Sequence, residues 1–204
     1  MISSCRFLLL FTITNHILLS SYAEGSGSTD TTLTDMVRID NFYIDKYEFP
    51  NQANHFPTVD VTFTQAQSIC GQVGKRLCSE QEWQRAATGP DNYIYGYGDT
   101  FESGRCNTPV LRHSHWESGR SLAKSGAFPL CCNNYGLYDM IGNVWEWTNG
   151  WHSQAHQWRV VRGGSYFNSA NMARSDSRYG QFLHEQFYLD LIGFRCCKSV
   201  SNNN

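Results

Sequence analysis

Two short helices are predicted by apolar residues that recur at helical spacing near the start of the chain. The first follows Thr64, whose side chain suits a helix N-cap, and Gly74 fits its end. Its apolar positions are Ala66, Ile69, Cys70 and Val73. The second begins at Ser79, which forms a Ser-x-x-Glu capping box with Glu82. Its buried side comprises Trp83, Ala86 and Ala87, and Gly89-Pro90 ends it.

Extended segments surround these helices. Apolar and polar residues alternate from Met36 to Ile44, and Pro57 to Phe63 forms a second short extended stretch. Further strands are expected at Trp158 to Val161 and at Ile192 to Cys196. Residues 90–134 have no regular period, which predicts a long ordered loop. The pattern therefore predicts an α+β, loop-rich domain.

The central run, residues 135–147, follows neither a helical nor a strand period. Its large aromatic side chains require burial, and its glycines indicate bends of the backbone. Asp139 and Glu146 supply carboxylates, and the carbonyls of Gly142 and Val144 lie between them in sequence. Such oxygen ligands in a rigid loop suit calcium. The alternative is that both carboxylates only cap backbone amides of the loop.

Composition limits the classes of protein. A chain of 204 residues with 41% hydrophobic and 17% charged residues is long enough for one sizeable core. The formal net charge of −2 gives no reason to expect nucleic acid as a partner.

The first 23 residues are typical of a secretory signal. Arg6 precedes an apolar stretch from Phe7 to Leu19, and Ala23 offers a cleavage site. Polar residues interrupt that stretch, so a transmembrane anchor is not expected. Residues 24–35 have the composition of a flexible linker. We therefore expect a secreted or periplasmic protein.

Export changes the interpretation of the eight cysteines, because an oxidising compartment favours disulfides over thiolate metal sites. Removal of Cys5 with the signal would leave seven, so one is expected to be free or paired with another molecule. Cys131 and Cys132 are adjacent and are expected to have separate partners.

Five ordered motifs resemble the formylglycine-generating enzyme family, also called sulfatase-modifying factor domains. They are FYIDKYEFPN (42–51), GKRLCSEQEW (74–83), GLYDMIGNVWEW (136–147), RVVRGGSY (159–166) and IGFRC (192–196). The resemblance implies one C-type-lectin-like domain over residues 36–197, followed by a disordered tail, 198–204. It also implies a disulfide between Cys70 and Cys196. It places the calcium ligands at Asp139, Gly142, Val144 and Glu146, and Asn107 matches the first ligand of an otherwise eroded second site.

The catalytic centre of the family is not expected here. Enzymes of the family hold copper(I) through two cysteines shortly after the Arg-Gly-Gly-Ser run, and soft thiolates are what copper(I) requires. Asn168 stands at the first position, and no cysteine occurs between Cys132 and Cys196. Two pairs of histidines are expected to be structural or surface residues and not iron ligands. They stand at positions 113 and 115 and at positions 152 and 156.

The segment 179–191 is rich in aromatic residues and leucine. It either fills the local core or forms a ligand-contact surface, and the sequence leaves both open. Similar proteins diversified by retroelements vary the residues between these last two motifs. The residues assigned to such a surface are Tyr166, Phe167, Asn168, Tyr179, Phe182, His184, Phe187 and Tyr188.

Together these features predict an exported, non-catalytic binding module with structural calcium and no copper. Its expected partner is a protein or a glycan, and its surface would lie within residues 166–191. The alternative is a formylglycine-generating or related oxidase with a rearranged site that acts on a cysteine of sulfatases.

Overall fold

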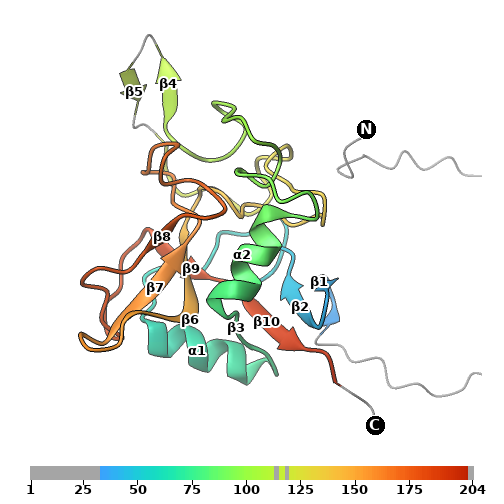
Figure 1. Cartoon of the computed structure of the whole chain (residues 1–204), viewed down its shortest axis with the longest axis vertical. Coiled ribbons are helices and arrows are strands. Elements are labelled where there is room, and N and C mark those ends of the chain that lie inside the picture. Colours follow the sequence, from blue (N-terminus) through green and yellow to red (C-terminus); the bar gives the residue numbers. More distant parts are fainter. Residues whose placement is uncertain (1–32, 113–114, 118–119, 202–204) are drawn as a thin grey trace, which may run out of the picture.

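A computed structural model describes residues 33–112, 115–117 and 120–201. Two α-helices, α1 (Phe63–Gln72) and α2 (Glu80–Thr88), combine with short strands in three sheets. The strands are β1 (Met36–Ile39), β2 (Phe42–Asp45), β3 (Arg76–Leu77), β4 (Val110–Arg112), β5 (His115–Glu117), β6 (Trp145–Ser153), β7 (Trp158–Arg162), β8 (Arg178–Tyr179), β9 (Ile192–Phe194) and β10 (Cys196–Ser199). The predicted α+β, C-type-lectin-like architecture is confirmed (Figure 1).

The first sheet has the order β1-β2-β10-β3, with antiparallel neighbours. The stretch from Met36 to Ile44, predicted as one strand, is instead a tight hairpin. Its turn contains Asp40 at φ 49°, a left-handed conformation that aspartate adopts more readily than most residues. The turn preserves the alternation on both sides, so the pattern alone did not show it. β10 extends to Ser199 and thus includes two residues assigned to the disordered tail.

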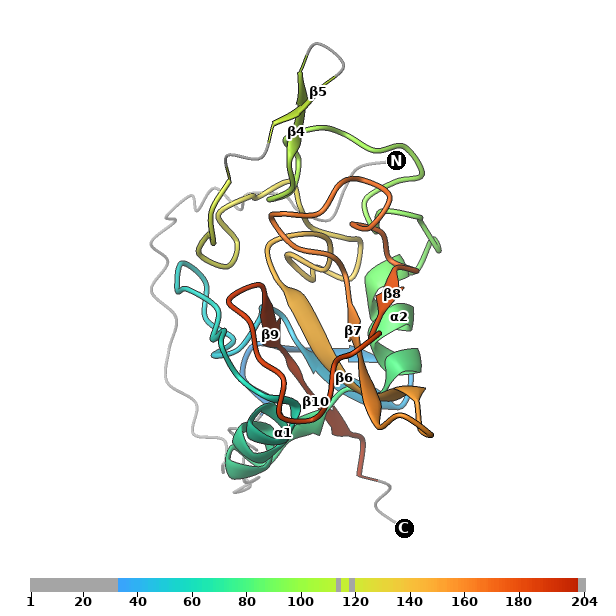
Figure 2. The same cartoon turned by 90° about the vertical axis from the view of Figure 1, so that its left-hand side faces the viewer.

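The second sheet has the order β8-β7-β6-β9. β6 pairs antiparallel with β7 and parallel with β9. The sequence predicted an irregular loop through Trp147, but the nine-residue strand β6 already begins at Trp145. Its first four residues are all buried, so they show no alternation of apolar and polar positions. The separate β4–β5 hairpin projects from the rest of the molecule (Figures 1 and 2).

Both predicted helices are present, but α1 begins two residues earlier than expected. Thr62, not Thr64, is its N-cap: the Thr62 hydroxyl accepts a hydrogen bond from the amide of Gln65, whose side chain accepts one from the Thr62 amide. This is a capping box that uses glutamine in place of glutamate. Residues 57–62, predicted as extended, form no strand. The capping box of Ser79 and Glu82 on α2 is formed as predicted.

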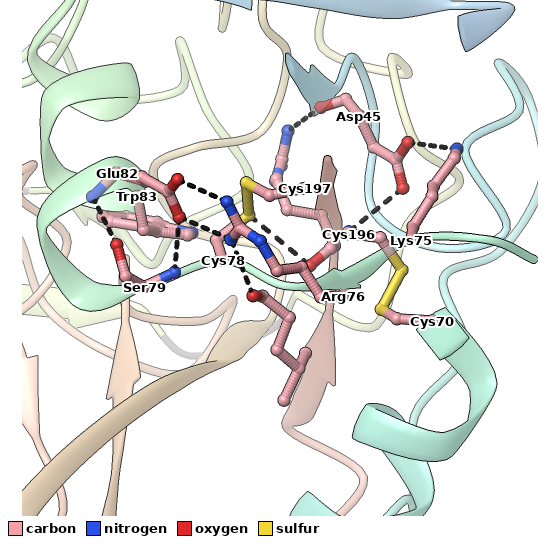
Figure 3. Close-up of a disulfide and its surroundings, with 12 residues drawn as sticks. Asp45, Cys70, Lys75, Arg76, Cys78, Ser79, Glu82, Trp83, Cys196 and Cys197 are labelled. Atoms are coloured by element: carbon pink, nitrogen blue, oxygen red, sulfur yellow. Dashed lines mark hydrogen bonds and ion pairs between the residues drawn. A yellow bond between two sulfur atoms is a disulfide. The ribbon is translucent and has the colours of Figure 1, made fainter. Parts of the chain in front are cut away.

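Disulfides connect these elements (Figure 3). Cys70 at the end of α1 is bonded to Cys196, and Cys78 between β3 and α2 is bonded to Cys197. Because neighbouring residues of a strand point to opposite faces, adjacent cysteines on β10 are anchored on different sides of the sheet. A third disulfide joins Cys106 to Cys131 within the long irregular segment.

Candidate functional site

The site most suited to a ligand is an apolar cavity of about 270 Å³ beside the second sheet. We call it the aromatic pocket. It is lined by Trp145, Val161, Asn168, Tyr179, Gln181, Phe182, Leu183, Phe187, Leu189, Leu191 and Ile192. The side chains of Trp145, Val161, Leu183 and Ile192 are buried and belong to the core that α1 also covers. The floor of the pocket is therefore part of the rigid interior, and its rim comes from the segment between β7 and β9.

Backbone contacts fix that rim. After β8, the chain runs down to α1 and returns to β9 (Figure 2). The amide of Arg159 on β7 donates to the carbonyl of Leu183 at 2.8 Å, and the amide of Trp145 on β6 donates to that of Leu191 at 2.8 Å. A Cβ on Gly180 would lie 2.3 Å from the Arg159 carbonyl oxygen, so only glycine permits this approach. The aromatic rim is thus held by strands on two sides.

The residues assigned to a ligand-contact surface divide into two groups. Four of them line the aromatic pocket: Asn168, Tyr179, Phe182 and Phe187. The others, Tyr166, Phe167, His184 and Tyr188, lie outside its lining. The rings of Phe182 and Tyr188 are each 61% exposed, and that of Tyr179 is 39% exposed. Leu183, in contrast, is 5% exposed and fills the core. The segment therefore contributes both to the core, through Leu183, and to an exposed aromatic surface, while ligand contact by that surface stays a prediction.

Trp158 on β7 connects the rim to three histidines, of which His152 lies at a ring centroid distance of 6.2 Å. The ring of His156 stacks on Trp158 at a centroid distance of 4.6 Å, and Phe182 contacts it at 4.8 Å. His184 lies edge-on at 6.3 Å. Across the residues that the structure describes, no three histidine, cysteine or acidic side chains are grouped as metal ligands. His113 lies outside the described residues.

Asn168, which the resemblance to the family places at the position of a copper-binding cysteine, forms hydrogen bonds with Ser165. Its side-chain oxygen accepts hydrogen bonds from the amide of Ser165 at 3.1 Å and from the hydroxyl of Ser165 at 2.7 Å. The part of the chain that is described contains no free cysteine. Copper(I) requires thiolate or comparable soft ligands, so the residues present do not fit the family's copper centre.

The central loop brings its two carboxylates into the interior. Asp139 Oδ2 accepts a hydrogen bond from the amide of Gly126 at 2.7 Å. Glu146 accepts hydrogen bonds from Trp83 Nε1 at 2.7 Å and from the guanidinium of Arg195. Burial raises the pKa of Asp139 to about 7, and the charge of Glu146 adds to this rise. Calcium bound by Asp139, Gly142, Val144 and Glu146 stays a prediction, and it requires Glu146 to exchange Arg195 for the ion.

A buried polar network behind this loop was not predicted. Glu48 is fully buried and accepts hydrogen bonds from the hydroxyl of Ser125 and from Asn143 Nδ2, the latter at 2.8 Å. The amide oxygen of Asn143 in turn accepts a hydrogen bond from Asn107 Nδ2 at 2.8 Å. Burial raises the pKa of Glu48 well above its usual value, and Asp139 and Glu146 contribute further. The partners of Glu48 are distant in sequence, so the sequence could not predict the network. The only sequence signal was that Glu48 and Asn143 both lie within motifs of the family.

Comparisons with known proteins agree with this geometry. The family profile described as "Sulfatase-modifying factor enzyme 1-like domain" matches residues 45–200. The inactive C-alpha-formylglycine-generating enzyme 2 of Bos taurus is 37% identical over 156 residues, which cover 71% of this chain and 51% of the relative. The chain thus spans about half the length of that curated relative.

Two solved structures share the fold. Treponema denticola variable protein 1 superposes with a TM-score of 0.62 at 18% identity, covering 78% of this chain and 84% of that one. The Major Tropism Determinant U1 variant superposes with a TM-score of 0.56 at 14% identity, covering 81% of this chain and 52% of that one. The motifs, the fold and the match over residues 45–200 together show that this chain belongs to the sulfatase-modifying factor enzyme 1-like, or formylglycine-generating enzyme, family.

Proposed function

We propose that this protein is an exported, non-catalytic binding module whose ligand, a protein or a glycan, is held at the aromatic pocket. The observation that carries this proposal is the rim itself. Phe182 and Phe187 are 61% and 36% exposed although they are large aromatic residues that line the pocket, and they sit on a backbone that β6 and β7 hold in place. Rigid, exposed aromatic side chains are typical anchors of binding surfaces.

The chemistry of the site supports binding over oxidation. Asn168 takes the place of a copper-binding cysteine, and its side-chain oxygen is committed to Ser165. A relative that is 37% identical is itself named an inactive enzyme of this family. The names of the two superposed structures, a variable protein and a tropism determinant, agree with a fold that is used for recognition. The alternative, an oxidase acting on sulfatase cysteines, is supported by membership of the family alone, and the side chain at Asn168 does not favour it.

Export is part of the proposal, and the disulfides support it. Three disulfides in a small domain are typical of proteins that mature in an oxidising compartment. Among the described residues, no helix has the length and apolar character needed to cross a membrane. The leader assigned to residues 1–23 lies outside the described residues.

A ligand screen with matched variants tests the proposal. The purified, oxidised chain is offered to a glycan array and to a phage-displayed random peptide library. Any ligand obtained is titrated against Phe182→Ala and against Phe56→Ala as the control. Phe56 is 55% exposed and does not line the pocket, so both changes remove an exposed ring.

We expect at least one saturable ligand whose affinity falls about tenfold or more in Phe182→Ala, as for a binding hot spot, and is unchanged in Phe56→Ala. The absence of saturable ligands from both screens would contradict the proposal. So would a ligand that is equally sensitive to both substitutions.

A further inference from the structure

The aromatic pocket has an acidic end. Leu189 and Leu191 both line the pocket, and Asp190 lies between them. The amide of Asp60 donates to the carbonyl of Leu189 at 3.4 Å, so a second exposed acidic residue lies next to this segment. Burial raises the pKa of Tyr166, and the charges of Asp190 and Asp60 both add to this rise. Two exposed acidic residues that are 130 positions apart in numbering therefore lie next to Leu189, which lines the cavity, although Asp60 itself lines a neighbouring cavity.

These two carboxylates differ from the other acids around the second sheet. Glu185 forms an ion pair with Arg159 at 2.5 Å. Glu80 is held by Arg162 at 2.7 Å and by Arg178 at 2.5 Å. Among the residues that the structure describes, neither Asp60 nor Asp190 is in an ion pair with a cationic side chain of the chain itself. Their charge is thus available to a ligand.

The interior of the pocket selects for apolar groups. Four of its lining residues carry polar side-chain atoms: the amides of Asn168 and Gln181, the hydroxyl of Tyr179 and the ring nitrogen of Trp145. The other lining residues are apolar. The side-chain oxygen of Asn168 is already used by Ser165. A sugar ring buried here would leave hydroxyl groups without partners, which is unfavourable. A cavity of about 270 Å³ lies just below the range of about 300–1,000 Å³ typical of pockets for whole small molecules, so it suits one or two side chains.

We propose that the aromatic pocket binds a segment of a partner protein in which a bulky apolar side chain enters the cavity and an adjacent lysine or arginine meets Asp60 and Asp190. This proposal rests on the proposed binding function and specifies its ligand. The spacing fits, because the acids are direct neighbours of the lining residues and the long stem of lysine or arginine reaches past the rim. The charge of Arg178, which precedes the lining residue Tyr179 in the chain, is already matched by Glu80.

Sequence preferences of selected peptides test the proposal. A phage-displayed random heptapeptide library is panned against the full oxidised chain, against the double variant Asp60→Asn, Asp190→Asn, and against a control, Asp40→Asn, Asp91→Asn. The control removes the same charge from exposed acids elsewhere on the surface. Asp60 has φ 56°, a conformation that asparagine also adopts readily, so the test variant preserves the backbone. Thermal melting of all three proteins confirms that they are folded.

We expect the parent and the control to enrich peptides that join a large apolar residue to lysine or arginine. For one such peptide, affinity should fall about three- to tenfold in the test variant and with added salt, as for exposed charge pairs. Replacing its apolar residue by alanine should abolish binding.

Enrichment of apolar peptides without basic residues, or equal enrichment by the test variant, would overturn the acidic-end proposal and leave the binding function intact. Glycan binding that is lost in Phe182→Ala would have the same effect. If neither peptides nor glycans bind at the pocket, both proposals fail.

Discussion

Arg195 and Glu146 form a fully buried, bidentate ion pair, with Arg195 Nη2 2.8 Å from Glu146 Oε1 and Arg195 Nε 2.8 Å from Glu146 Oε2. The pair joins the junction of β9 and β10 to strand β6. The same guanidinium donates to the backbone carbonyls of Asp45, Lys46 and Tyr138. One arginine therefore connects the two larger sheets to the central loop.

Loss of this arginine should be costly. We expect Arg195→Met to lower the free energy of unfolding by about 3–5 kcal/mol, because it leaves the carboxylate of Glu146 buried without its cation. Urea denaturation measures the change. Arg85→Met, which removes an exposed ion pair with Asp40, is the control and should cost less than about 1 kcal/mol. Similar losses in the two variants would contradict the role assigned to the buried pair.

Calcium binding at the central loop is tested by removing calcium. If Asp139 and Glu146 hold the ion together with carbonyls of Gly142 and Val144, chelation should lower the melting temperature, because the ion stabilises only the folded state. Glu146→Gln should remove most of that sensitivity. The control variant Glu102→Gln, which changes an exposed carboxylate that is not a predicted ligand, should retain the sensitivity to chelation. Identical melting of the parent protein with and without chelator would contradict the calcium prediction.

Glu82 should make stability depend on pH on the acid side. Burial alone would raise its pKa, but hydrogen bonds from Arg76 and from the amide of Ser79 outweigh burial and lower the pKa below 4.5. The stabilisation is therefore present above about pH 4.5 and is lost as the pH falls through the lowered pKa of the folded state.

The variant Glu82→Gln separates charge from capping. Glutamine can still cap α2, so the variant should be less stable than the parent at pH 7, and the difference should be smaller at pH 3. Ser79→Ala should cost about 1 kcal/mol at both pH values, because it removes the N-cap itself. Chemical denaturation at the two pH values measures both. A difference in stability between the parent and Glu82→Gln that is as large at pH 3 as at pH 7 would show that charge is not responsible.

The protein should not convert a sulfatase-type cysteine to formylglycine by the copper mechanism of its family. Asn168 is a poor ligand for copper(I), and the only sulfur between residues 169 and 173 is the thioether of Met172. Purified protein, copper(I), oxygen and a cysteine-containing peptide are incubated, and the peptide is analysed by mass spectrometry. Conversion above a copper-only control would contradict this prediction.

The helices and the family motifs were within reach of sequence reasoning because their signals are local. Ser79 and Glu82 are three residues apart, and the capping box between them formed as expected. The pairing of Cys78 with Cys197 was beyond reach, because many pairings of seven cysteines fit the same spacings. The β1–β2 hairpin was missed because its turn does not interrupt the alternation.

In the candidate site, too, some features could be predicted from local sequence and others depend on the fold. The aromatic residues of the segment 179–191 indicated either a ligand-contact surface or a local core, and the sequence did not decide between the two. Their arrangement around Trp145, Val161 and Ile192 depends on β6, β7 and β9 meeting in space. Asp60 carried no sequence signal, because only the folded chain brings it beside Leu189.

The two adjacent cysteines of β10 have a mechanical consequence. A tensile load applied at the C-terminal end of the domain passes from Cys197 to Cys78 and from Cys196 to Cys70 through covalent bonds. It therefore reaches α1 and the start of α2 without depending on the hydrogen bonds of β10. The segment that forms the rim of the aromatic pocket precedes this clamp, so it lies outside the main path of the force. A partner held at the pocket could then be retained while the C-terminal end is under tension.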